Sequence, residues 1–226
     1  MARLARAVFP GIAHHVTQRG NGRQRTFFAD ADYALYRELL RGHCAEAGVA
    51  VWSYVLMPNH VHLILVPGDE DGLRRALAPL HRRYAGHVHA RERRTGHFWQ
   101  GRFGCVAMDE DHLAAAVRYV AMNPVRAALC KRAPDWPWSS AATLLGLDDD
   151  GVTEAEPVRR RIPDLAALLE SAEDEERTMR LRRGESVGRP IGSAQWLEAL
   201  ECDRGRTFRR RRPGPKAREE LSALSP

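Results

Sequence analysis

Residues 57–66 read Met57-Pro58-Asn59-His60-Val61-His62-Leu63-Ile64-Leu65-Val66. The apolar run that follows Asn59 predicts a buried strand. Side chains alternate between the two faces of a strand, so His60 and His62 point to one face and Val61 to the other. Two interpretations of the histidine pair are open: two half-buried structural histidines, or a two-point clamp for a metal ion.

A second apolar run, Val49 to Met57, directly precedes this strand, with Pro58-Asn59 as the connection. A proline at the first central position cannot take the positive φ of the usual two-residue hairpin turns. Either the loop is therefore wider than it looks, or the backbone beside His60 is unusual.

Strands and helices alternate along the first half of the chain. Their order, strand-helix-strand-strand-helix-strand, predicts an α+β fold of the ferredoxin-like (βαββαβ) type, with an antiparallel sheet and both helices on one face. His60 and His62 would then point to the uncovered face. The expected strands are Ile12 to Gln18, Val49 to Met57, His60 to Val66 and Phe103 to Met108, and the expected helices are Asp30 to Ala47 and Gly72 to Arg93.

The segment Asp109 to Pro124 predicts an amphipathic helix that can cover this face. Asp109 suits the N-cap position, and acidic residues fill the first turn. Tyr119 lies off the apolar stripe, and Asn123 follows it by four residues on the same side of the helix. The helix would bring a phenol and an amide towards the two imidazoles. The apolar stripe consists of Leu113, Ala116, Val117 and Val120.

Asn123 and Tyr119 each have a second interpretation. Proline suits the first position of a helix and disfavours helical backbone in the residue before it, so Asn123 also reads as the N-cap of a new short helix. A capping amide uses its oxygen on a backbone N–H, which leaves less of it for a metal. Tyr119 also suits ordinary amphipathic packing.

The second half of the chain has a different character. We interpret residues 1–132 as a catalytic domain, 133–203 as a helical extension and 204–226 as a basic tail that stays disordered until it meets phosphate. Within the extension the pattern predicts an acidic loop over Gly146 to Pro157, one helix over Pro163 to Arg182, a loop over Gly184 to Gly192, and a short helix over Ser193 to Leu200.

Composition narrows the class of protein. The chain has 226 residues, 44% of them hydrophobic, and a formal net charge of +6, which favours a polyanionic partner, although an arginine-rich genome also produces such a charge. No apolar run reaches the length of a membrane span and no signal peptide is evident, so we expect a cytoplasmic protein with no membrane partner. The four cysteines show no Cys-x-x-Cys spacing, which argues against a zinc ribbon.

Six short motifs together resemble one family, the single-tyrosine HUH transposases, and within it the IS200-like REP-associated tyrosine transposases of bacteria. Ala121 departs from the pattern, because many relatives carry histidine there. The motifs are residues 15–24 (HVTQRGNGRQ), 58–62 (PNHVH), 98–103 (FWQGRF), 119–127 (YVAMNPVRA), 138–140 (WSS) and 188–192 (GRPIG).

The resemblance implies a metal-dependent endonuclease and strand transferase that acts on single-stranded DNA folded into hairpins at palindromic repeats. It implies Mg²⁺ or Mn²⁺ held by His60, His62 and Asn123, with Tyr119 as the nucleophile that forms a 5′-phosphotyrosine link. The ligand types alone would equally allow Co²⁺ or Zn²⁺. The protein would be a nucleoid-associated monomer or homodimer. Two rivals remain: a catalytically silent repeat-binding protein, and a metal phosphodiesterase that uses water.

Candidate DNA-binding residues come from three segments. Those at the end of the first strand would read base edges or serve turn chemistry, those around residue 100 would stack bases and bind phosphate or simply pack, and those of the tail would bind phosphate. In this order they are Gln18, Arg19, Asn21 and Arg23, then Trp99 and Arg102, then Arg209, Arg210, Arg211 and Arg212.

Deleting the residues after Asp203 should weaken DNA binding and flatten its dependence on salt. Seven basic residues lie between Arg204 and Lys216, and each phosphate contact that they make releases counterions. The measurement is the slope of log affinity against log salt concentration for the full-length and truncated proteins. An unchanged slope would mean that the tail does not engage DNA.

Overall fold

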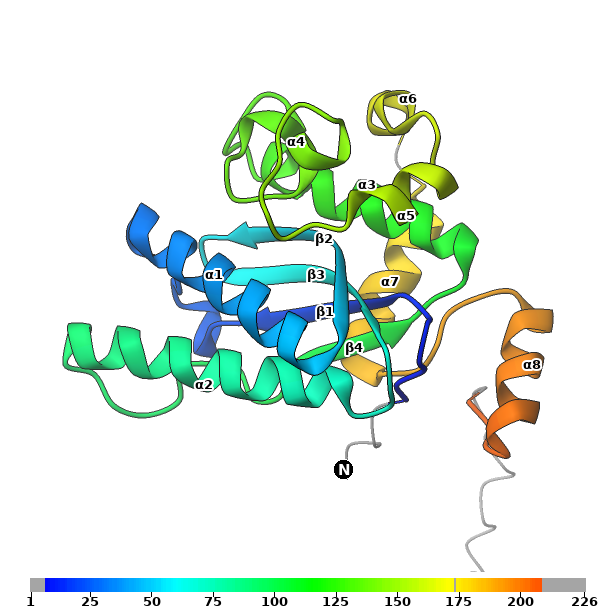
Figure 1. The fold of residues 1–226 in the computed structure, drawn as a ribbon, viewed down its shortest axis with the longest axis horizontal. Helices are drawn as coiled ribbons and strands as arrows, with labels where there is room; N and C mark the ends of the chain where they lie inside the picture. Colours follow the sequence, from blue (N-terminus) through cyan, green and yellow to red (C-terminus); the bar gives the residue numbers. More distant parts are fainter. Residues whose placement is uncertain (1–6, 173, 209–226) are drawn as a thin grey trace, which may run out of the picture.

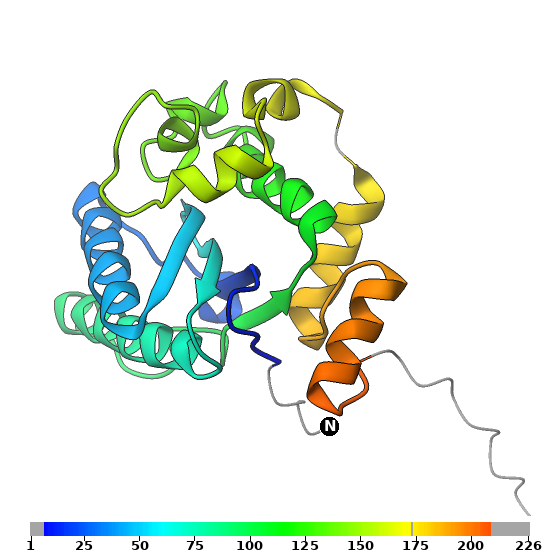
Figure 2. The same ribbon diagram turned by 45° about the vertical axis from the view of Figure 1, so that its right-hand side comes forward.

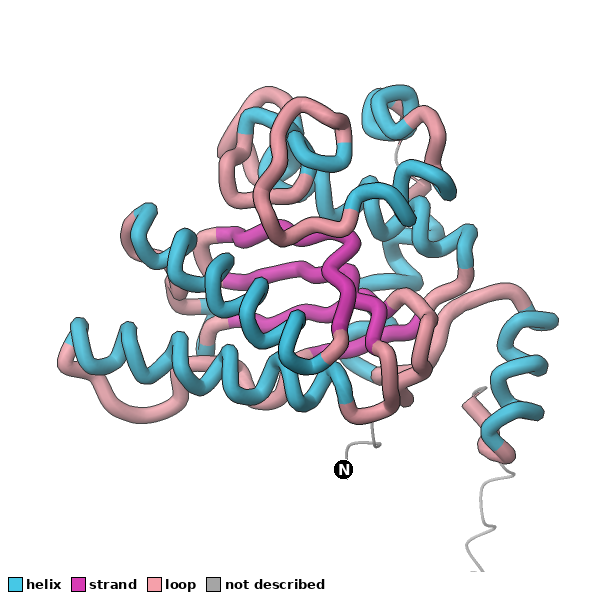
Figure 3. Tube along the Cα trace, viewed as in Figure 1, coloured by secondary structure: helices cyan, strands magenta, loops and turns pink. Residues whose placement is uncertain are grey.

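A four-stranded antiparallel sheet forms the centre of the protein (Figures 1 and 3). The computed structural model describes residues 7–172 and 174–208. The strand order β2-β3-β1-β4 confirms the predicted α+β fold with the ferredoxin-like succession of elements. The strands are β1 (His14–Arg19), β2 (Val49–Met57), β3 (His60–Pro67) and β4 (Gly104–Ala107).

Two long helices, α1 (Asp30–Ala47) and α2 (Gly72–Glu92), cover one face of the sheet (Figure 1). Tyr36 of α1 and Tyr84 of α2 are completely buried there with Leu63 of β3. This burial of large apolar side chains is the main stabilising term of the fold.

An ion pair between a buried carboxylate and a partly exposed guanidinium joins the two helices. Asp32 near the start of α1 is fully buried, and its carboxylate accepts hydrogen bonds from the backbone N–H groups of Phe28 and Ala29 and from the Arg91 guanidinium of α2. Burial by itself raises the pKa of Asp32, but these hydrogen bonds outweigh it and hold the pKa below its usual value.

The opposite face is covered by α3 (Glu110–Arg126) and α7 (Glu175–Val187), which pass beside each other in Figures 1 and 2. Side chains from this face, such as Ile64, pack with Val117 of α3 and Leu181 of α7 in a second buried cluster. The alternation along β3 therefore separates the two faces as predicted, with Leu63 under α1 and α2 and Ile64 under α3.

Short helices complete the second half of the chain. Val158 and Leu165 are buried in the same cluster as Val117, so residues of the extension share a core with the sheet. Arg204, the first residue of the predicted tail, ends α8 and pairs with Glu70. The remaining elements are α4 (Ala141–Leu144), α5 (Ala155–Arg161), α6 (Leu165–Glu170), α8 (Ala194–Arg204), and the 3₁₀ turns η1 (Asn21–Arg23) and η2 (Ala133–Asp135).

The prediction of one helix over Pro163 to Arg182 is wrong. Two helices, α6 and α7, occupy the segment because it contains two N-caps: Asp164 accepts a hydrogen bond from the N–H of Ala167, and Asp174 accepts one from the N–H of Arg177. The loop predicted from Gly184 starts later, because α7 continues to Gly188, whose φ of 70° ends the helix. The predicted acidic loop likewise ends early, at α5.

Asn123 does not start a second helix, which corrects the capping interpretation. Helix α3 continues through Pro124 to Arg126, and the main-chain oxygen of Asn123 accepts a hydrogen bond from the N–H of Ala127. A proline this close to the end of a helix removes only one hydrogen bond of the ladder.

The connection at Pro58-Asn59 is a true two-residue loop, because Met57 pairs directly with His60. Of the two alternatives for this connection, the wider loop is therefore excluded. Neither loop residue has a positive φ. The loop is stabilised by hydrogen bonds to the segment that follows β1. The carbonyl of Pro58 accepts hydrogen bonds from the N–H groups of Thr26 and Phe27, and the carbonyl of Asn59 accepts one from the N–H of Gly20.

No helix within residues 7–172 and 174–208 combines the length and the apolar character that crossing a bilayer requires.

Replacing Asp32 by asparagine should lower the free energy of unfolding by about 2 kcal/mol at neutral pH, because it removes the charge from a buried acceptor of several hydrogen bonds. The folded-state pKa of Asp32 is lowered, so its contribution is complete above about pH 4 and disappears as the pH falls through the folded-state pKa. Urea unfolding at several pH values measures the difference between the two proteins.

Asp71→Asn is the matched control, because Asp71 pairs with Arg74 on the exposed surface. It should leave the urea midpoint unchanged. Equal unfolding curves for wild type and Asp32→Asn at neutral pH would contradict the stabilising role of the buried Asp32 carboxylate.

Candidate active site

Three histidines lie together on the face of the sheet beneath α3. In the register of β1 with β3, Thr17 pairs with His62, so His15 is the diagonal neighbour of His62 on the same face. His15 Nε2 lies 3.0 Å from His62 Nδ1, and the two imidazoles share a hydrogen bond. The rings of His60 and His62 are 4.9 Å apart between centroids.

Tyr119 of α3 contacts the histidine cluster. The centroid of its ring lies 5.2 Å from that of His62 and 5.9 Å from that of His15, both in edge-to-face contact. The side chain is largely buried, with 7% of the residue exposed. The structure therefore brings the predicted nucleophile to the predicted histidine face, and it adds His15, which the sequence analysis did not select.

Asn123 lies one helical turn after Tyr119 on the same side of α3. It is 9% exposed, and its amide nitrogen Nδ2 is buried without a hydrogen-bond partner among the described residues. A buried amide with unused capacity is costly unless a ligand satisfies it. The unused atom is a hydrogen-bond donor, so it suits an acceptor such as a phosphate oxygen.

Burial keeps the three imidazoles neutral. It lowers the pKa of His15 to about 4, and that of His60 to about 3 with a further contribution from the charge of Arg19. Burial, followed by the neighbouring His15 and His60, holds the pKa of His62 well below its usual value. A neutral imidazole is the form that binds a metal ion.

The orientation of the His60 ring suits the binding of a divalent cation. His60 Nδ1 donates a hydrogen bond to Asn59 Oδ1 over 2.6 Å, which leaves the lone pair on Nε2 and resembles the second-sphere contact of metal-binding histidines. Within the described part of the chain, no three histidine, cysteine, aspartate or glutamate side chains form a metal-binding group. A site with three protein ligands would need a third ligand of another type, and the amide oxygen of Asn123 is of a suitable type.

Two arginines cover the ring of Tyr119. The guanidinium carbon of Arg126 lies 4.2 Å from the ring centroid, and that of Arg182, on α7, lies 5.4 Å away. Neither was selected from the sequence. Arg126 is in the quoted motif of residues 119–127, but no local pattern distinguishes Arg182 from its neighbouring arginines.

The candidate DNA-binding residues of the first half gather at the same end of the sheet. Arg19 pairs with His60 across the strands. Trp99 forms a bridge with Gly20, and the N–H of Gln100 donates to the carbonyl of Arg19. The segment that follows β1 and the segment that precedes β4 therefore lie side by side next to His60.

The candidate DNA-binding side chains differ in whether their polar groups are exposed and available to bind DNA. Gln18 is buried and donates to the carbonyl of Gly101, and Trp99 is half-buried with its indole N–H on the carbonyl of His81. These two serve packing at least as much as recognition. The exposed members are Asn21, Arg23 and Arg102, whereas Arg209, Arg210, Arg211 and Arg212 lie outside the described residues.

Two adjoining hollows, of about 340 and 370 Å³, extend from this end of the sheet along the last turns of α2. They share His89, His97 and Phe98, and Arg82 and Arg94 add positive charge. We call them the basic hollows. Their lining suits phosphate groups.

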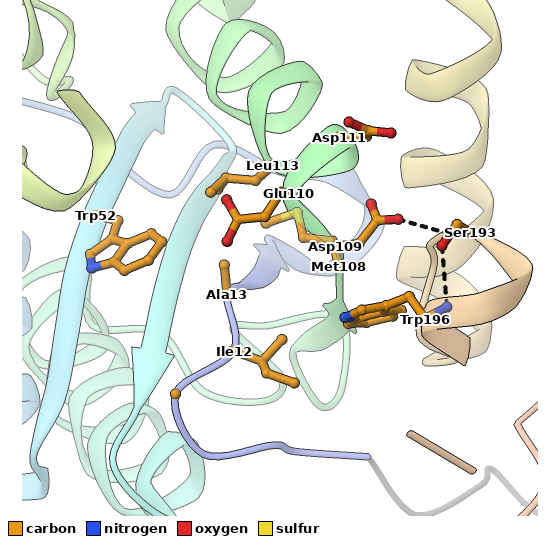
Figure 4. A pocket seen from close by; sticks show the side chains of 11 residues that line it. Ile12, Ala13, Trp52, Met108, Asp109, Glu110, Asp111, Leu113, Ser193 and Trp196 are labelled. Carbon is orange, nitrogen blue, oxygen red and sulfur yellow. Dashed lines mark hydrogen bonds between the residues drawn. The ribbon is translucent and has the colours of Figure 1, made fainter. Parts of the chain in front are cut away.

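A third hollow, of about 310 Å³, lies at the first turn of α3 and is lined by acidic side chains, Asp109 to Asp111, between Trp52 and Trp196 (Figure 4). Asp109 accepts a hydrogen bond from the N–H of Ser193 over 2.7 Å. Tyr119 follows Asp111 by eight residues on α3. Because a helix rises 1.5 Å per residue, it lies about 12 Å further along the helix axis. The carboxylates would repel nucleic-acid phosphates, so this hollow is separate from the candidate active site.

Comparisons with known proteins agree with this geometry. The family described as "Transposase IS200 like" matches residues 9–123, which include the histidine cluster, Tyr119 and Asn123. A comparison with curated protein sequences gave no significant match.

Solved structures similar to this chain include two transposases. One is a REP-associated tyrosine transposase bound to a REP hairpin, with 20% sequence identity, a TM-score of 0.56, and coverage of 68% of this chain and 98% of the other. The second is a putative transposase from Deinococcus radiodurans R1, with 18% identity, a TM-score of 0.38, and coverage of 53% and 95%. The first similarity establishes the fold, and the family match spans more than half of the chain. The chain belongs to the IS200-like transposase family.

Proposed function

We propose that this transposase-family protein is a metal-dependent endonuclease and strand transferase that cleaves single-stranded, hairpin-forming repeat DNA through a 5′-phosphotyrosine intermediate. The observation that carries the proposal is the contact of the Tyr119 ring with His62, which joins a phenol on α3 to a neutral imidazole pair on β3. A nucleophile beside ligands for a cation is the arrangement that phosphoryl transfer requires.

The reaction is a transfer between two oxygen atoms. The phenol oxygen of Tyr119 attacks the scissile phosphorus and forms the O–P bond, while the bond from phosphorus to the 3′ oxygen breaks. The phenol gives up its proton and the 3′ oxygen gains one. The covalent link conserves the phosphodiester energy, so a second 3′ hydroxyl can reverse the reaction without ATP.

A divalent cation such as Mg²⁺ or Mn²⁺, when bound, supplies Lewis-acid polarisation of the phosphate. His60 and His62 would hold it through ring nitrogens and Asn123 through its amide oxygen. The protein prepares these ligands itself: burial keeps the imidazoles neutral, and Asn59 orients the His60 ring.

The proposed substrate is a DNA hairpin with an unpaired strand beside it. A transposase of similar fold has been solved bound to a REP hairpin. In this chain, exposed Arg23 and Arg102 belong to the segments beside His60, and the basic hollows add positive charge along α2. A DNA substrate would place the protein at the bacterial nucleoid in the cytoplasm, as a monomer or a homodimer.

Replacing Tyr119 by phenylalanine should abolish strand cleavage and the covalent protein–DNA adduct while hairpin binding is retained. The change removes one oxygen and keeps the ring contacts with His62 and His15. The measurement is a denaturing gel of protein with labelled hairpin DNA and Mg²⁺ or Mn²⁺, followed by mass spectrometry of the trapped peptide.

Tyr33→Phe is the matched control, because Tyr33 belongs to the core under α1 on the opposite face. It should form the adduct as wild type does. An adduct on any tyrosine other than Tyr119 would refute the assignment, and cleavage without an adduct would favour the phosphodiesterase that uses water.

His60→Ala and His62→Ala should each reduce cleavage by about a hundredfold or more at saturating metal, because a Lewis acid contributes several kcal/mol to the transition state. Hairpin affinity should change little. His87→Ala, an exposed histidine on α2, is the control with normal cleavage. Cleavage at the wild-type rate in both site variants would remove the metal site from the proposal.

A further inference from the structure

The ring of Tyr119 is flanked by guanidinium groups from two different parts of the chain. Arg126 comes from the last turn of α3 and also donates a hydrogen bond to the main-chain oxygen of Tyr119 over 3.1 Å. Arg182 comes from α7, in the C-terminal extension. Both arginines lie beyond residues 9–123, so the family match assigns neither of them.

Helix α7 is packed so that Arg182 is held at this place. Leu181 is fully buried in the cluster under α3, and Thr178 is nearly so, which defines the inward face of the helix. A Cβ atom at Gly184 would lie 3.0 Å from a methyl group of Val106 on β4, so this glycine allows the helix to approach the sheet closely. Arg182, next to Leu181, is exposed beside Tyr119.

The charges at the site indicate what the two arginines do. The guanidinium groups of Arg126 and Arg182 both lie against the ring of Tyr119, so they supply positive charge beside the phenol. An attacking phenol oxygen needs a phosphate beside it, and the charge on the non-bridging phosphate oxygens must be stabilised as the new bond forms. A guanidinium group matches two phosphate oxygens with its planar fork.

We propose that Arg182, supplied by the C-terminal extension, is a catalytic residue that acts with Arg126 to bind the scissile phosphate beside Tyr119 and to stabilise the charge on its non-bridging oxygens. The inference rests on the proposed function. Neither arginine gains or loses a proton: the Tyr119–phosphorus bond forms, the bond to the 3′ oxygen breaks, and the guanidinium groups only donate hydrogen bonds. The helical extension is thereby part of the active site.

A purely structural role for Arg182 makes a different prediction. A guanidinium that only packs on the aromatic ring would hold Tyr119 in position, and its loss would slow attack on any phosphorus centre equally. A phosphate-binding role depends on the charge of the non-bridging oxygens. A substrate that carries a neutral methylphosphonate at the scissile position separates the two roles.

The experiment compares wild type, Arg182→Gln and Arg182→Lys for hairpin affinity and for the rate of adduct formation at saturating DNA and Mn²⁺. With the normal phosphodiester, Arg182→Gln should slow adduct formation by about tenfold to a hundredfold, and Arg182→Lys should fall between it and wild type. Hairpin affinity should change less than about threefold, since one contact among many is lost. With the methylphosphonate, wild type and Arg182→Gln should react at nearly the same rate.

Arg180→Gln is the matched control, because Arg180 lies on the same helix and pairs with Glu176 on the exposed surface. It should react as wild type does, and thermal unfolding of all variants reports on folding. If wild type forms the adduct and Arg182→Gln matches its rate, or loses the same factor on both substrates, the role of Arg182 is refuted and the proposed function stands. If wild type forms no adduct, the proposed function itself fails.

Discussion

The pairing of β1 with β3 is the interaction on which the rest of the site depends. It places Thr17 opposite His62 and Arg19 opposite His60, so His15 can share a hydrogen bond with His62. A shift of this register by one residue would turn every one of these side chains to the other face. The apolar alternation of β3 prevents such a shift, because Leu63 and Ile64 belong to different cores.

The two hydrophobic cores, one on each face of the sheet, have different roles. The core under α1 and α2 is dominated by large aromatic and aliphatic side chains and stabilises the sheet. The opposite core supports the candidate active site, and the C-terminal extension contributes to it through residues such as Val158 and Leu181. The extension therefore packs directly against the core that carries the candidate active site. Its helix α7 places Arg182 beside the ring of Tyr119.

Positively and negatively charged side chains gather on different parts of the surface. Positive charge collects at the end of β1 and in the basic hollows, whereas carboxylates line the hollow at the first turn of α3. The opposite ends of α3 thus face different surroundings: an acidic start, stabilised by the helix dipole, and an end where arginines surround the tyrosine. A polyanion approaching α3 would be repelled from its first turn and attracted to its last.

Local pattern was enough to predict the strands, both long helices, the shared face of His60 and His62, and the position of Tyr119 on α3. These features depend on the periodicity of strands and helices, which is written in consecutive residues. The tertiary structure alone decided the partnership of His15 with His62 and the approach of Arg182, since both join residues far apart in the chain. It also decided the break between α6 and α7, where two N-caps outweigh the apolar periodicity. In α3 the opposite holds, because the helix continues through Pro124 despite the capping signal of Asn123-Pro124.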